Sequence, residues 1–191
     1  MSRKVLVTAV ILMAVALLAT QYIDMARATP PTQISGRWVG ITGSAIFSNM
    51  KIAGGNVFVD IYNEGTYSSG DILGSFEQTF TAVVHYGDPE IAKNIETIPI
   101  PLRPDSDFNW IKMERVFTGT VLGVPGGLTI RLEAKGYGNA LRGSAYYDLE
   151  GTWVIISGTE GLANLHGQGT WWHSRTGYIG LEYEGQVHFD P

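Results

Sequence analysis

Alternating apolar and polar residues recur along this chain, and they predict β-strands that bury one face. In residues 57–62, Val57, Val59 and Ile61 alternate with Phe58, Asp60 and Tyr62, and the same two-residue period runs through 76–85, 128–135 and 179–189. Successive side chains of a strand point to opposite faces, so each segment presents one apolar face. All 24 glycines lie after residue 28, which favours strands joined by tight turns.

We expect about eight strands, over residues 37–41, 56–67, 74–86, 112–122, 127–135, 141–149, 152–156 and a hairpin or two strands within 166–189. Strands of this length joined in sequence would leave two exposed edges unless the sheet closed on itself. The sequence therefore predicts an all-β, closed antiparallel barrel in a single domain, residues 36–191, rather than a sandwich.

One segment, residues 87–109, lacks the alternation and contains Pro89, Pro99, Pro101 and Pro104. Proline donates no backbone hydrogen bond, so we expect neither a strand nor a helix there. This irregular loop is either a long hairpin excursion or a binding loop.

The N-terminus has the pattern of a secretory signal. Arg3 and Lys4 precede the uncharged run 5–19, and Ala26-Arg27-Ala28 forms a small-x-small cleavage site. We predict that residues 1–28 are a signal peptide and 29–35 a linker, which places the barrel outside the cytoplasm as a secreted protein. The alternative is an uncleaved anchor, in which case only residues 1–28 contact the membrane.

Composition excludes several classes of partner. The chain has no cysteine, which rules out disulfides and thiolate metal sites. Its formal net charge of −5 becomes −7 without residues 1–28, which carry Arg3, Lys4, Arg27 and Asp24. An acidic surface argues against nucleic acid and anionic lipid.

Glycine-rich motifs late in the chain carry a family resemblance. They are Gly119–Gly123 followed by Gly127–Ile130, then Trp153–Thr159 and Gly161–Gly169, with a further match at 70–77. With these motifs the chain resembles domain-of-unknown-function family 3224, whose members look like relatives of the allene oxide cyclase and dirigent barrels. The resemblance implies an eight-stranded antiparallel barrel with a cavity and supplies no catalytic residue. Glu160 stands where a glycine would be commoner in this turn.

Candidate catalytic groups are sparse. The four histidines, His85, His166, His173 and His188, lack metal-ligand spacing, so we predict no metal and no cofactor. Glu182 and Glu184 share one face of the last strand, where a solvated face explains them better than a glycosidase pair. No G-x-S-x-G elbow surrounds Ser157, and no catalytic residue is assigned.

Aromatic side chains are the better indication of a ligand. Trp171-Trp172 and Tyr146-Tyr147 each send one ring to either face of a strand. We predict that Trp171, Tyr146 and Tyr183 line an interior that binds a small apolar molecule, and that the protein is not an enzyme. An interior filled by side chains would contradict this hypothesis.

Two alternatives remain open. An isomerase or cyclase would need a buried ionisable group, for which Glu133, Glu182 and Glu184 are the candidates. A cell-surface interaction or assembly subunit would use the barrel as a scaffold, and the sequence leaves the oligomeric state open. Gly167 and Gly169 lie in a predicted strand, where glycine is unusual. We therefore predict that neighbouring backbone or a bulky aromatic ring packs in the space that a Cβ at these positions would occupy.

Overall fold

The computed structural model describes residues 30–40, 45–86, 88–94, 106–138, 147–173 and 180–190. The signal peptide predicted over residues 1–28 and the predicted ligand residue Tyr146 lie outside these ranges. Nine strands of the described part form one antiparallel sheet: β1 (Thr32–Gly40), β2 (Ile46–Ala53), β3 (Asn56–Gly70), β4 (Ile72–Tyr86), β5 (Ser106–Val121), β6 (Val124–Gly138), β7 (Tyr147–Glu160), β8 (Leu165–His173) and β9 (Leu181–Phe189).

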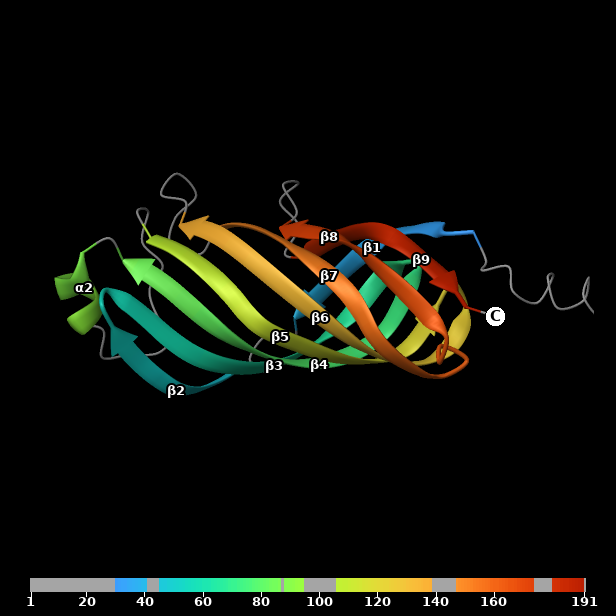
Figure 1. Cartoon of the computed structure of the whole chain (residues 1–191), viewed down its shortest axis with the longest axis horizontal. Helices are drawn as coiled ribbons and strands as arrows, with labels where there is room; N and C mark the ends of the chain where they lie inside the picture. Colours follow the sequence, from blue (N-terminus) through green and yellow to red (C-terminus); the bar gives the residue numbers. More distant parts are fainter. Residues whose placement is uncertain are drawn as a thin grey trace, which may run out of the picture.

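Eight of the strands close into a barrel, as predicted. Neighbours follow the order β1-β9-β8-β7-β6-β5-β4-β3, and β1 pairs back with β3 from Gly36 opposite Gly70 to Gly40 opposite Gly65. The first half of β3 pairs with the extra strand β2, beyond the point where β1 ends. Figure 1 shows β3 to β6 reaching toward the helix α2, while β1, β8 and β9 lie in the other half.

The strand prediction is wrong in three places. Strand β2 was not predicted, because Ile46 and Ile52 are 62% and 39% exposed, while Phe47 and Met50, which pack partly against the core, are three residues apart and break the alternation. Strand β1 takes over residues 32–35 of the predicted linker 29–35, because Ile34 is buried and lies opposite Gly185 of β9. The segments predicted as 141–149 and 152–156 meet in one strand, β7.

The irregular segment 87–109 also differs from prediction. It contains a short helix, α2 (Pro89–Lys93), and strand β5 already begins at Ser106. Proline is tolerated in the first turn of a helix, where its missing N–H would have no partner. The Asp88 side chain accepts a hydrogen bond from the Glu90 N–H at 2.9 Å and caps the helix. Among the described residues, no helix is both long and apolar enough to cross a membrane.

The turn after β7 closes one end of the barrel. Leu162 is completely buried, and its N–H donates to the Thr159 carbonyl at 3.1 Å. Glu160 has a φ of 55°, the left-handed conformation that favours glycine, which explains why a glycine would be commoner at this position. The glycine-rich sequence after β7 therefore forms a tight turn that buries Leu162.

Gly167 and Gly169 face the interior, and the prediction for both is confirmed. A Cβ on Gly169 would collide with the Glu184 carbonyl oxygen and lie 2.7 Å from the Trp153 ring. A Cβ on Gly167 would lie 2.6 Å from a Val187 methyl group. A Cβ on Gly167 would also lie 2.8 Å from the Gln186 carbonyl oxygen. The Trp153 indole occupies the space that a side chain at Gly169 would need, and its Nε1 donates to the Glu184 carbonyl at 3.2 Å.

Candidate functional site: a packed interior and an outer groove

Trp171 and Tyr183 lie in the barrel interior, 1% and 3% exposed. Trp172 points outward, so the two adjacent indoles take opposite faces as expected. The side chains around Trp171 and Tyr183 leave a cavity of about 10 Å³, lined also by Trp38, Tyr67, Ile72, Ile130, Leu132 and Trp153. A space of that size holds one water molecule, so a small apolar molecule does not fit between these side chains as they are packed.

The interior is filled mainly by aromatic rings. Trp171 lies 5.5 Å from Trp38 and 6.0 Å from Trp110, centroid to centroid. Tyr67 packs edge-on against Phe76 at 5.6 Å and against Tyr183 at 5.5 Å. These separations are typical of packed aromatic cores.

An arginine lies inside this aromatic core. Arg115 of β5 is fully buried, and its guanidinium carbon lies 3.9 Å from the ring centroid of Trp38 and 3.9 Å from that of Phe76. Its Nε and Nη2 donate to the Gln78 side-chain oxygen at 2.9 and 2.6 Å, and Nη1 donates to the Tyr67 hydroxyl at 2.6 Å. Burial lowers the pKa of Arg115, although the guanidinium stays charged at neutral pH.

The three carboxylates proposed for an isomerase face the outside. Glu133 and Glu184 are exposed. Glu182 binds Arg37 at 3.2 Å and accepts a hydrogen bond from Trp172 Nε1 at 3.1 Å. The proposed catalytic role of these three residues is therefore wrong, because none of them reaches the interior.

The histidines lie apart from the interior cluster. His166 and His188 stack at 5.5 Å and contact Asp190 at 3.1 and 3.4 Å. His85 lies between the side chains of Asn56 and Asn109. Among the residues that the structure describes, no three His, Cys, Asp or Glu side chains are placed to hold a metal ion.

Two hollows lie on the outer face of β5 to β8. We call them together the outer groove. One part, of about 510 Å³, is lined by Arg131, Leu132, Glu133, Thr152, Trp153, Val154, Gln168, Gly169 and Thr170. The other part, of about 530 Å³, is lined by Asn109, Trp110, Ile111, Glu133, Ala134, Lys135, Glu150, Gly151, Thr152 and Thr170.

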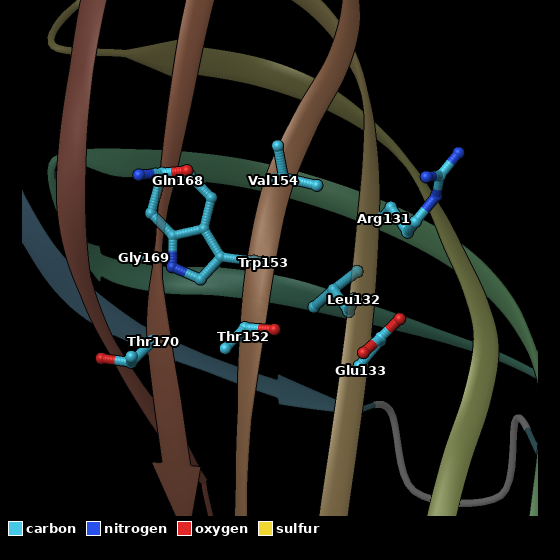
Figure 2. Close-up of a pocket in the computed structure, with 9 residues that line it drawn as sticks. All are labelled: Arg131, Leu132, Glu133, Thr152, Trp153, Val154, Gln168, Gly169 and Thr170. Carbon is cyan, nitrogen blue, oxygen red and sulfur yellow. The ribbon is translucent and has the colours of Figure 1, made fainter.

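The two parts of the outer groove share Glu133, Thr152 and Thr170 and are therefore continuous. These three residues lie opposite one another on adjacent strands, Glu133 facing Thr152 and Thr152 facing Thr170. Figure 2 shows Thr152 of β7 between Thr170 of β8 and Glu133 of β6. The outward-pointing residues of β6, β7 and β8 therefore place Thr152 and Thr170 at the centre of the groove, with Glu133 beside them.

Sequence reasoning missed the outer groove, because it considered only which side chains would face the interior. The groove depends on cross-strand neighbours, which follow from the register of β6, β7 and β8. Arg115 was missed as well, because a register shift between Trp110 and Met113 turns it inward.

Comparison with known proteins adds little. No family model matches the chain, and no curated protein matches it. A solved structure that resembles it is a protein of unknown function from the DUF3224 family of Shewanella oneidensis MR-1, with 12% identity and a TM-score of 0.48, covering 85% of this chain and 99% of that one. At this similarity the membership in family 3224 and the likeness to allene oxide cyclase stay predictions, and the chain is a β-barrel protein that resembles a DUF3224 structure.

Proposed function

We propose that this protein is an exported, non-catalytic binding protein that holds an uncharged oligosaccharide in the outer groove. One contrast carries the proposal: the interior around Trp171 and Tyr183 has room for one water molecule, whereas the two parts of the groove measure about 510 and 530 Å³. Ligand sites are commonly hollows of roughly 300–1,000 Å³. The ligand predicted for the interior is therefore moved to the outside of the barrel.

The chemistry of the groove suits a molecule rich in hydroxyl groups. Arg131, Glu133, Thr152, Gln168 and Thr170 form no side-chain hydrogen bond or ion pair with other described residues. They offer guanidinium and amide donors, carboxylate and amide acceptors, and hydroxyls that do both. A sugar hydroxyl also donates and accepts, so it can use every one of these groups.

The charges in the groove favour a neutral ligand. Arg131 and Lys135 balance Glu133 and Glu150, so neither anions nor cations are selected. Apolar side chains flank the polar centre, since Val154 and Ile111 are each 37% exposed. These aliphatic side chains can cover apolar C–H groups of a ligand and remove them from water.

Binding is favoured over hydrolysis of the sugar. Glycoside hydrolysis uses two carboxylic groups, one as an acid and one as a base or nucleophile. Glu150 is bound by Lys135 at 3.0 Å, which leaves Glu133 as the unpaired carboxylate among the described groove residues. The competing hypothesis is that the same surface binds another protein, which predicts no saccharide binding.

We expect Thr170→Arg to abolish oligosaccharide binding, because a long side chain would fill the centre that both parts of the groove share. The probes are neutral oligosaccharides on a glycan array, followed by calorimetric titration of those retained. Thr118→Arg is the matched control, since Thr118 is also exposed on a strand and lies outside the groove lining. Absence of any saccharide binding by the wild type, or equal binding by both variants, would contradict the proposal.

Export is tested at the N-terminus. We expect the mature protein to begin at Thr29, because Ala26-Arg27-Ala28 satisfies the small-x-small rule and Pro30 and Pro31 prevent helix continuation. N-terminal sequencing of protein recovered from outside the cytoplasm measures this directly. A chain that retains Met1 in the membrane fraction would show an anchored protein instead.

A further inference from the structure

The imidazole of His85 on β4 has a carboxamide partner at each of its two nitrogens. Its Nδ1 lies 2.6 Å from the Asn56 side-chain oxygen on β3, and its Nε2 lies 3.0 Å from Asn109 Nδ2 on β5. A carboxamide oxygen only accepts hydrogen bonds, and a carboxamide nitrogen only donates them. The ring is therefore neutral, with its proton on Nδ1 and an acceptor at Nε2.

Asn109 connects His85 to the outer groove. It lines the part of about 530 Å³, which extends from β5 across β6 to β8, whereas His85 lies on β4, on the other side of β5. Lys135, opposite Asn109 on β6, is bound to Glu150 at 3.0 Å, and no described residue donates to Asn109 Oδ1. Because His85 holds Nδ2, Oδ1 is the polar atom that Asn109 offers to a ligand in the groove.

We infer that His85 is a positioning residue that sets the orientation of the Asn109 carboxamide, and that protonation of His85 reverses it. A protonated imidazole donates from both nitrogens, so its Nε2–H would face the Asn109 NH2, which is also a donor. A half-turn of the carboxamide places Oδ1 against Nε2–H and turns the NH2 toward the groove. The groove then offers a donor where it offered an acceptor. The choice of a saccharide as ligand rests on the proposed function, whereas the reversal is a property of the protein alone.

A protonated His85 can be accommodated, because an acidic residue lies opposite it. Asp107 of β5 is exposed and directly opposite His85, and side chains opposite each other on antiparallel strands are neighbours. Strand β3 contributes a neutral amide on the other side. Helix α2, which also contacts β4, is capped by Asp88 and carries Glu90 and Lys93, which pair with each other. Among these described neighbours, Asp107 is the charge that can accompany a protonated ring.

Nuclear magnetic resonance of the isotope-labelled protein without ligand tests the reversal. Histidine ordinarily titrates between about pH 5 and 8. At the upper end of this range we expect the His85 proton on Nδ1 and a nuclear Overhauser contact between the Asn109 NH2 protons and the His85 ring. Once His85 is protonated, this contact should be lost. A proton on Nε2 at the upper end, or a contact that persists with the protonated ring, would overturn the inference whether or not the groove binds a saccharide.

Calorimetric titration tests the consequence for ligand selection. The probes are a neutral oligosaccharide retained on the glycan array and its singly O-methylated derivatives, because an ether oxygen accepts hydrogen bonds but cannot donate them. For the hydroxyl that meets Asn109, methylation should weaken binding about fivefold at pH 8, the effect of one lost hydrogen bond, and clearly less at pH 5.

Two histidine variants separate this effect from a general pH effect. His85→Gln should show the same methylation penalty at both pH values, because glutamine does not titrate. His166→Gln is the matched control and should keep the pH dependence, since His166 lies on β8 beside Asp190 and outside the groove lining. A methylation penalty that changes with pH equally in the wild type and His85→Gln, or with pH in neither, would overturn the assignment of His85.

Discussion

Gly169→Val is expected to destabilise the folded protein strongly. A Cβ at this position would collide with the Glu184 carbonyl oxygen and the Trp153 ring. The carbonyl belongs to strand β9, next to β8, so relief requires a shift of the ladder and not a side-chain rotation. Overpacking costs about 1–3 kcal/mol where side chains can adapt, and we expect at least the upper end here. For a domain of this size about 3 kcal/mol lowers the melting temperature by roughly 6–12 °C.

Two other glycines serve as controls for this result. Gly185→Val should behave like Gly169→Val, because its Cβ would collide with the Gln168 carbonyl and the same indole. Gly40→Ala should change the midpoint little, because its nearest neighbours are Asn63 Nδ2 at 3.6 Å and the Glu64 carbonyl at 3.8 Å. Thermal melts followed by circular dichroism compare the three. A Gly169→Val midpoint equal to that of Gly40→Ala would show that the β8–β9 ladder yields easily.

The barrel could be predicted because the alternation that marks its strands can be seen within short stretches of the sequence. Two-residue alternation marks most strands, and the need to remove exposed edges favours closure. Strand β2 escaped this reasoning, since it pairs with the first half of β3 and its partly buried residues Phe47 and Met50 lie three positions apart, which breaks the two-residue alternation. Helix α2 escaped because Pro89 was read as a breaker, whereas at the first helical position it is compatible with a helix.

The inward position of Arg115 could not be read from the alternation of β5. Phe108 is buried and Trp110 partly buried, so strict alternation would next turn Lys112, Glu114 and Val116 inward. A register shift between Trp110 and Met113, with Lys112 at a φ of 54°, reverses the phase and buries Met113, Arg115 and Phe117. A β-bulge adds one residue to a strand, and a sequence alone does not show where it is added.

Arg115→Met is expected to destabilise the protein by about 2 kcal/mol or more, although methionine fills most of the space. The change leaves the Gln78 side-chain oxygen, on a residue 2% exposed, without its donor, and an unsatisfied buried polar group costs about 1–3 kcal/mol. It also removes the contacts of the cation with Trp38 and Phe76. Urea denaturation of both proteins measures the difference in the free energy of unfolding.

Adding Gln78→Leu to Arg115→Met should restore part of that stability, because replacing both partners by apolar groups removes the unsatisfied oxygen. Removing a buried charge together with its partner is often neutral or stabilising. We therefore expect a coupling energy of about 1–3 kcal/mol between the two positions, from urea denaturation of the wild type, the two single variants and the double variant. If the single effects simply add, Gln78 does not satisfy Arg115, and the geometry of the buried pair is wrong.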